Sequence, residues 1–204
     1  GWSSRRLRAE YPWLEVVPRS GDFDSLVRLA QWEGPERRLV FFPGSTIGNL
    51  DPGEAVAFLT TLTEVVGREG GLLIGVDLKK DPGILEAAYN DSRGVTAAFN
   101  RNLLVRINRE LGADFDPEAF DHRAFYNDRS GRIEMHLVSR RGQTVRIDGH
   151  PFRFAAGEHL HTENSYKYTV EEFRDLAAAA GWRPRQVWTD PEGLFSVHYL
   201  DVAD

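Results

Sequence analysis

The sequence predicts an α/β protein in which a partly parallel sheet is interrupted by an inserted α+β segment. Two apolar runs, RRLVFFPG and GGLLIGVDL, flank the helical stretch DPGEAVAFLTTLTEVV, a spacing typical of one crossover in a parallel sheet. After Lys79 the pattern changes to helices and alternating strands, and the first pattern returns near Thr169. The predicted boundaries are 1–79 and 167–204 for the α/β domain and 80–166 for the insertion.

The first elements follow in order along the chain. SSRRLRAEYP is expected to be a polar helix that ends before Pro12, and Leu14 to Val17 a short strand that ends in a Gly-Asp turn. SLVRLAQW has the pattern of a short amphipathic helix. RRLVFFPG is a continuous apolar run, which predicts a strand covered on both faces.

The helix that follows has strong start signals. Asp51 is expected to be the N-cap, with Pro52 at the first helical position and Glu54 three residues after the cap. GGLLIGVDL is then the next buried strand of the sheet.

The insertion combines both kinds of element. PGILEAAYND and GVTAAFNRNLLVRINRELGADF are expected to be helices, the second with Phe99, Leu103, Ile107 and Leu111 on one face and Gly112 past its end. RIEMHLVSR, QTVRID and FRFAAGEHLHTENSYKY alternate as strands of a mostly antiparallel sheet. The crossing points DLKKDPG and SYKYT are expected to lie side by side.

The last stretch resumes the α/β pattern. Thr169 and Glu172 form a capping box at the start of TVEEFRDLAAAAGW, and Gly181 ends that helix. RPRQVWTDPEGLFSVHYLDVA predicts two strands joined by a Pro-Glu-Gly turn.

Composition excludes several functions. The 204 residues carry a net charge of −6 without a basic block, which disfavours a nucleic-acid groove. There is no cysteine, so thiol catalysis, disulfides and thiolate metal sites are excluded. No apolar run approaches the roughly 18 residues of a membrane span, and we expect a cytoplasmic protein. His159 and His161 share a strand face, but solvent-facing or pocket-lining histidines are favoured over metal ligands, and no metal is expected.

Candidate ligand-binding residues lie where parallel strands end, since open α/β sheets bind ligands outside the carboxyl ends of their strands. Asp22 and Phe23 form either a plain turn or a pair that accepts from an exocyclic amine and covers a purine ring. The stretch 44–49 is either a turn with positive φ at Gly44 or Gly48 or a place where backbone approaches a ligand.

Four residues of the insertion also stand out. Glu163 and Ser165 share one strand face and suit an N–H-bearing ring such as imidazole, although for the pair taken alone an exposed strand face is the favoured explanation. Tyr89 is consistent with a half-buried tyrosine, and Met135 with core.

Six segments taken together resemble the histidine-specific Nα-methyltransferases: FPGSTIGNL, DLKKDPGILEAAYND, GVTAAFNRNLLVRINRELGADFD, RIEMHL, GEHLHTENSYKY and WTDPEGLFSVHYL. That family transfers methyl groups from S-adenosylmethionine to histidine, giving N,N,N-trimethylhistidine (hercynine) on the way to ergothioneine. The resemblance implies a class I (Rossmann-like) methyltransferase sheet with an inserted histidine-binding domain.

The resemblance also implies roles for individual residues. Asp22 and Phe23 are expected to contact adenine, and Gly44 and Ser45 to belong to the cofactor loop. The expected substrate residues are Asn49 and Tyr89 for the carboxylate or amine, Glu163 and Ser165 for imidazole, Met135 beside them, and Thr96 and Phe99 at the amine. No catalytic group acts by direct chemistry, because alignment of amine and methyl carbon suffices.

Two departures from the family leave alternatives open. Some members of the family have Cys-Lys-Phe directly after the serine that corresponds to Ser165, so Tyr166 and Tyr168 mark a subgroup. In addition, the glycine-rich cofactor loop is not in the sequence. We therefore expect the chain to be the C-terminal part of a longer, monomeric protein that binds histidine and its methylated forms. A methyltransferase for another amino acid or small amine, or a non-catalytic binding remnant, remains the alternative.

Overall fold

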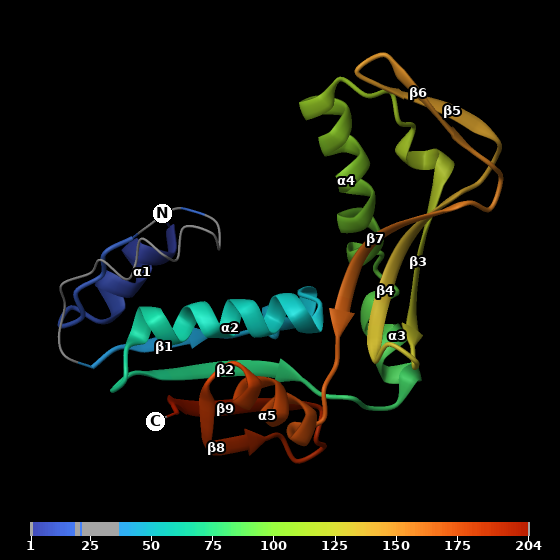
Figure 1. Cartoon of the computed structure of the whole chain (residues 1–204). Coiled ribbons are helices and arrows are strands. Elements are labelled where there is room, and N and C mark those ends of the chain that lie inside the picture. The colour runs from blue at the N-terminus through green and yellow to red at the C-terminus, as the bar shows by residue number, and fades with distance from the viewer. Residues whose placement is uncertain (1, 19–20, 22–36, 204) are drawn as a thin grey trace.

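A four-stranded sheet in the order β1-β2-β9-β8 forms the lower part of the molecule in Figure 1. The computed structural model describes residues 2–18, 21 and 37–203. The strands are β1 (Leu39–Phe42), β2 (Gly71–Asp77), β8 (Trp182–Thr189) and β9 (Phe195–Val202). β1 and β2 are parallel and β9 is antiparallel to both of its neighbours. The predicted α/β class and the predicted crossover are thus confirmed.

Two capped helices cover one face of this sheet. Helix α2 (Pro52–Val66) begins with the predicted capping box, in which Asp51 accepts from the Glu54 amide at 2.8 Å and Glu54 accepts from the Asp51 amide at 2.9 Å. Helix α5 (Val170–Ala179) begins with the same device at Thr169 and Glu172. Both helices bury their apolar residues against β2, β8 and β9 in one core. This packing holds the carboxyl ends of β1 and β2 in place.

The other face of β1 differs from the expectation. β1 is an edge strand, and Leu39 and Phe41 are 58% and 65% exposed, whereas Val40 and Phe42 pack on the core. The prediction that both faces are covered was therefore wrong for this strand. A continuous apolar run shows that a strand is apolar on both sides, but it does not show which neighbours are present to cover it.

The N-terminal elements are only partly as predicted. Helix α1 (Trp2–Glu10) forms and ends before Pro12. Leu14 to Val17, predicted as a strand, has no strand structure. A strand requires a hydrogen-bonded neighbour, and this segment pairs with none of the described strands. The helix predicted over 25–32 lies outside the described residues.

The insertion forms a second lobe. Its helices are α3 (Pro82–Tyr89), α4 (Val95–Leu111) and the 3₁₀ turn η3 (Pro117–Ala119). Its strands are β3 (Phe120–Asn127), β4 (Arg132–Ser139), β5 (Gln143–Ile147), β6 (His150–Phe154) and β7 (His159–Tyr166). They form an antiparallel β3-β4-β7 sheet and a β5-β6 hairpin, as expected, although the alternation had not indicated β3.

Helix α4 buries a face that matches the predicted one only in part, since Ile107 packs on the core as expected. Leu104 and Asn100 are buried, whereas Phe99 and Leu111 are 64% and 56% exposed. The Asn100 amide donates to the His136 carbonyl at 3.1 Å, so a polar anchor on the sheet fixes which face turns inward. Apolar spacing could not reveal this anchor. The helix ends at Gly112, with φ 61°, as predicted. None of the helices in the described part of the chain is long and apolar enough to cross a membrane.

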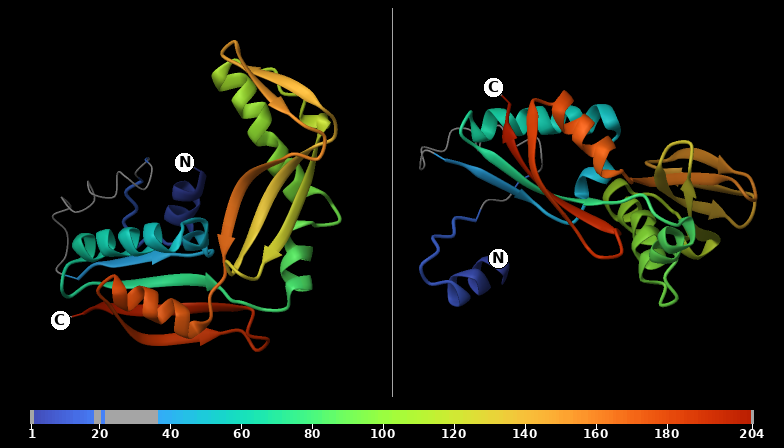
Figure 2. Two further views of the ribbon diagram at one scale, coloured as in Figure 1. Left: turned by 45° about the vertical axis from the view of Figure 1, so that its right-hand side comes forward. Right: turned by 90° about the horizontal axis from the view of Figure 1, so that it is seen from below.

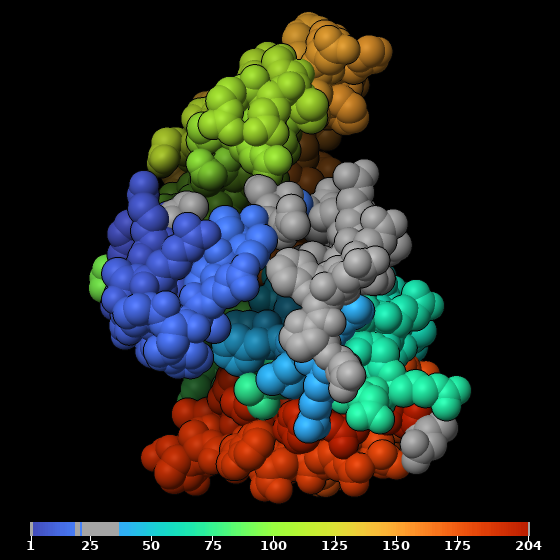
Figure 3. Space-filling view, turned by 90° about the vertical axis from the view of Figure 1, so that its left-hand side faces the viewer, coloured from blue at the N-terminus to red at the C-terminus, as the bar shows by residue number. Residues whose placement is uncertain are grey.

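The two crossing points between the lobes lie side by side, as predicted. Leu78 and Tyr168 form a parallel bridge, and the Lys79 amide donates to the Tyr168 carbonyl at 2.9 Å. The second lobe extends from this junction in both views of Figure 2, and the space-filling view shows α4 and the β5-β6 hairpin above the sheet (Figure 3). The junction therefore brings the end of β7 next to the end of β2.

Candidate functional site

The turn after β1 leaves the sheet in an unusual backbone conformation. Gly44 has φ 78° and Ser45 φ 56°, and the 3₁₀ turn η2 (Thr46–Asn49) follows. The positive φ predicted at Gly44 or Gly48 therefore occurs at Gly44 and extends to Ser45. The Ser45 hydroxyl accepts from the Asp77 amide at 2.8 Å, so it holds the turn against the end of β2.

Gly48 is needed for another reason, because the backbone of the turn passes very close to the backbone of strand β7 at this position. A Cβ atom on Gly48 would lie 2.7 Å from the Tyr166 carbonyl oxygen, which is closer than side chains tolerate. The turn after β1 thus packs directly on strand β7 of the second lobe. Without that contact the two lobes would not meet at this point.

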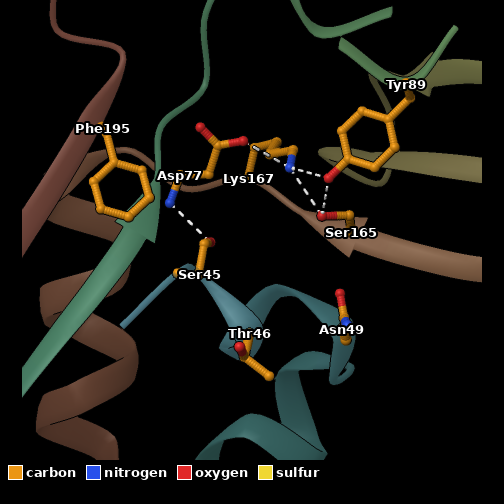
Figure 4. A pocket seen from close by; sticks show the side chains of 9 residues that line it. Ser45, Thr46, Asn49, Asp77, Tyr89, Ser165, Lys167 and Phe195 are labelled. Carbon is orange, nitrogen blue, oxygen red and sulfur yellow. Dashed lines mark hydrogen bonds and ion pairs between the residues drawn. The ribbon is translucent and has the colours of Figure 1, made fainter. Parts of the chain in front are cut away.

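A cavity of about 240 Å³ lies where the turn, the end of β2 and the second lobe meet (Figure 4). It is lined by Gly44, Ser45, Thr46, Asn49, Asp77, Tyr89, Ser165, Lys167 and Phe195. Five of these residues had been predicted as site residues: Gly44, Ser45, Asn49, Tyr89 and Ser165. The volume is below the roughly 300–1,000 Å³ of pockets for drug-sized ligands, so the cavity suits a molecule of amino-acid size.

Lys167 stands at the centre of the polar contacts in this cavity. Its ammonium donates to Asp77 Oδ2 at 2.8 Å, to Ser165 Oγ at 2.8 Å and to Tyr89 Oη at 3.0 Å (Figure 4). The side chain is 1% exposed. The second oxygen of Asp77, Oδ1, accepts from Lys80 at 2.5 Å. Two lysines therefore share one carboxylate, which leaves this group of three residues with one excess positive charge.

Glu163 and Met135 lie beside the cavity rather than in its lining. Glu163 points to the same face of β7 as Ser165, and Met135 is its direct partner on β4. Met135 is buried in a small core that Tyr89 also joins. Burial raises the pKa of Glu163, and the Lys167 ammonium opposes this effect. Glu163 is thus a partly desolvated carboxyl group next to the cavity.

The remaining predicted residues are not brought to the cavity. Thr96 is partly buried near the start of α4, where its amide donates to Asp91, and Phe99 is mostly exposed. Neither lines the cavity. Their assignment to an amine pocket stays a prediction. Asp22 and Phe23 lie outside the described residues.

Four lining residues had not been predicted as site residues, although one of them, Thr46, lies within the stretch 44–49 that had been considered as a ligand approach. Asp77 ends β2, and its position at a carboxyl strand end was a usable signal. Lys167 follows Ser165 by two positions, which is the alternation that had paired Ser165 with Glu163. Phe195 begins β9 after a turn, and nothing in the sequence indicated that its ring faces a ligand cavity.

A group of possible metal ligands lies elsewhere in the second lobe. Atoms of Glu134, His136 and His161 lie within 4.8 Å of one another. The two imidazole rings are stacked, however, with centroids 4.5 Å apart and planes at 16°, so they cannot both direct a lone pair at one ion. Although burial opposes it, hydrogen bonds from Arg132 and Asn127 lower the pKa of Glu134 to about 2. This geometry favours an ion-paired aromatic cluster over a metal site.

Comparison with known proteins identifies relatives of the chain. Residues 2–202 match the family model described as "Histidine-specific methyltransferase, SAM-dependent". The chain is 47% identical, over 94% of its length, to a protein of Mycolicibacterium smegmatis named histidine N-alpha-methyltransferase, and 44% identical to its namesake in Mycobacterium tuberculosis. An "Ergothioneine biosynthesis protein 1" of Neurospora crassa is 29% identical over 76% of the chain and 18% of its own length. The chain spans 60% of the length of each mycobacterial relative.

Proposed function

The chain belongs to the family of histidine-specific, S-adenosylmethionine-dependent methyltransferases, and we propose that it forms the substrate-binding part of a histidine Nα-methyltransferase. The product is N,N,N-trimethylhistidine (hercynine), and the pathway is ergothioneine biosynthesis. The α/β domain, 1–79 and 167–204, is proposed to face the cofactor, and the insertion, 80–166, to supply the groove for histidine. We also expect the enzyme to be cytoplasmic and monomeric.

One observation carries this proposal. The turn at the carboxyl end of β1 meets Tyr89 and Ser165 of the second lobe around a single small cavity with polar walls. Cofactors of open α/β sheets bind at the carboxyl ends of the strands. A substrate held by the second lobe would therefore lie next to a methyl donor held by the sheet.

Each residue has a proposed task in this cavity. Asn49 and Tyr89 anchor the carboxylate and amine of histidine, and Glu163 and Ser165 hold the imidazole ring beside Met135. The excess positive charge of Lys167 and Lys80 over Asp77 favours an amino acid, which carries a carboxylate. Phe195 offers an aromatic wall, and such walls accommodate a growing quaternary ammonium group.

The reaction itself requires little from the protein beyond alignment. In each transfer the neutral α-amine forms a bond to the methyl carbon, the carbon–sulfur bond breaks, and S-adenosylhomocysteine leaves. After each of the first two transfers the ammonium product loses a proton, which passes to solvent before the next transfer; the third product is quaternary and has no such proton. S-adenosylmethionine supplies the methyl group when bound. The chain's own residues bind the substrate, orient its amine and exclude water from it.

The part of the cofactor site in this chain fits such a ligand. A Cβ atom on Gly44 would meet no other atom within 4 Å, so the missing side chain leaves open space in the cavity wall. Gly44 and Ser45 are the proposed cofactor contacts, with Asp22 and Phe23 at the adenine. We propose that a glycine-rich loop from outside this chain completes the site, since the mycobacterial relatives are longer and Leu39 and Phe41 stand exposed at the β1 edge.

The test is methyl transfer by the full-length protein. Incubation with S-adenosylmethionine and L-histidine should give mono-, di- and trimethylhistidine by mass spectrometry. A panel of other amino acids and small amines under the same conditions separates histidine from other substrates. Methylation of another amino acid in preference to histidine, or no product while S-adenosylhomocysteine binds, would overturn the proposal. Calorimetry with S-adenosylhomocysteine compares the cofactor affinity of the full-length and the 204-residue forms. It shows whether cofactor binding needs residues outside the 204-residue chain.

A further inference from the structure

Lys167 satisfies all three of its donors within the protein. Its partners come from three elements, namely Asp77 at the end of β2, Tyr89 at the end of α3 and Ser165 on β7. A lysine ammonium has three N–H donors and no acceptor, so it has none left for a ligand. Its influence on a ligand must therefore pass through the groups that it contacts.

The direction of the hydroxyl protons of Tyr89 and Ser165 follows from their hydrogen bonds. Tyr89 donates its hydroxyl proton to Ser165 Oγ at 2.8 Å, and Lys167 donates to both hydroxyl oxygens. Ser165 Oγ thus accepts two hydrogen bonds, which occupy both of its lone pairs. Of these two hydroxyl protons, that of Ser165 is the one without an acceptor among the residues that the structure describes. Towards the cavity, Ser165 therefore acts as a donor and not as an acceptor.

We propose that Lys167 is a positioning residue that makes the site selective for the neutral form of the imidazole ring, an inference that rests on the proposed function. Neutral imidazole has one N–H donor and one unprotonated acceptor nitrogen. Glu163 accepts from the N–H, and Ser165 donates to the other nitrogen. Imidazolium has two donors, and its second N–H meets the Ser165 proton and the Lys167 ammonium.

The groups that surround Lys167 support a site that favours the neutral ring over the charged ring. Asp77, at the end of β2, contacts the ammonium through Oδ2, but its other oxygen, Oδ1, is already paired with Lys80. Tyr89 presents its ring to the ammonium, with Nζ 5.0 Å from the ring centroid. Glu163 is the other titratable group on this face of β7, and its protonation is the rival cause of any acid effect on binding. The experiment therefore needs a variant in which Glu163 cannot titrate.

The probe is N,N,N-trimethylhistidine, because its quaternary amine does not titrate and only its ring changes charge near neutral pH. Its Kd for the full-length protein with S-adenosylhomocysteine is measured by calorimetry at pH 8.0 and pH 5.5. With a ring pKa of ~6.5, selection of the neutral form predicts about tenfold weaker binding at the lower pH. The ratio is taken within each variant, so a uniform loss of stability or affinity cancels.

The variants separate Lys167 from its surroundings. Lys167→Met should reduce the pH ratio to below about threefold, because Ser165 can then accept a hydrogen bond from the ring. Glu163→Gln should bind more weakly at both pH values but keep the roughly tenfold ratio. Should Lys167→Met not fold, Lys167→Gln tests the same point, since its neutral amide keeps a polar partner for Asp77 but removes the ammonium charge, and it should also flatten the ratio.

Each outcome has a clear meaning. An unchanged ratio in Lys167→Met or Lys167→Gln, or a ratio lost in Glu163→Gln, would overturn the role of Lys167. Equal binding by the wild-type protein at the two pH values would do the same. Absence of trimethylhistidine binding in the wild-type protein at either pH would instead count against the proposed function.

Discussion

The Tyr89 hydroxyl donates a 2.8 Å hydrogen bond to Ser165 Oγ, although the two residues are 76 positions apart in the chain. The bond joins the end of α3 to strand β7 and closes one side of the cavity. Tyr89 and Ser165 had been assigned to different parts of the substrate, the carboxylate and the ring. Their contact predicts that the two proposed recognition tasks are coupled.

This coupling can be measured with Tyr89→Phe, Ser165→Ala and the double variant. Each single change should raise the KM for histidine roughly ten- to hundredfold, as expected for loss of a hydrogen bond to a charged or strongly polar group. The double variant should lose less than the product of the two effects, because each single change already breaks the shared bond. Strictly multiplicative effects in steady-state kinetics would show that the residues act independently.

Glu163 is expected to act on substrate binding alone. Glu163→Ala should raise the KM for histidine at least about tenfold, since a charge-assisted hydrogen bond to the ring is lost. The Kd for S-adenosylhomocysteine should stay unchanged. Glu64→Ala is the matched control, because Glu64 is an exposed carboxylate near the C-terminal end of α2, the end remote from the cavity. An unaltered KM in Glu163→Ala would remove Glu163 from the substrate site.

Gly48 tests the contact between the turn and the second lobe. In Gly48→Ala the new methyl group would collide with the Tyr166 carbonyl, so the turn must shift away from β7. We expect a loss of about 1–3 kcal/mol in the free energy of unfolding, together with weaker histidine binding. Gly142→Ala is the control, because its Cβ would meet no atom within 4 Å and its φ is not positive. Thermal denaturation that places both variants at the wild-type Tm would contradict this packing.

His198 should make the α/β core sensitive to acid. It is fully buried, and burial lowers the pKa of its imidazole from 6.5 to about 4, with Arg174 adding to the effect. Between these values the unfolded chain binds more protons than the folded one, so stability falls as the pH drops from 6.5 towards 4. The loss should reach about 3 kcal/mol below pH 4.

The matched variant for this prediction is His198→Leu, which cannot titrate. Ser196, which contacts His198 at 3.0 Å, keeps its bond to the Val76 carbonyl in that variant. Urea unfolding at pH 7 and pH 4.5 should show a smaller pH dependence for His198→Leu than for the wild-type protein. The same dependence in both proteins would assign the acid effect to other groups.

Much of this fold could be predicted because its signals are local. The capping boxes at Asp51 and Thr169, the stop at Gly112 and the crossover from β1 to β2 depend on residues a few positions apart. The prediction of a strand at Leu14 to Val17 was wrong for the opposite reason, because a strand depends on a hydrogen-bonded partner that the local sequence does not specify. The face of α4 was predicted only in part, with Phe99 and Leu111 exposed, because a polar anchor, Asn100, outweighed the apolar spacing.

The candidate site, too, has features that follow from the sequence and others that follow only from the tertiary structure. The sequence alone determined the family and part of the candidate site, because the six motifs taken together, among them those containing Asn49, Tyr89 and Ser165, are specific. Only the tertiary structure decided that Lys167 and Asp77 join them, because hydrogen bonds and ion pairs depend on distance in space and not on distance along the chain. The direction of the Ser165 proton, on which the proposed selectivity rests, likewise follows from three elements that meet only in the folded protein.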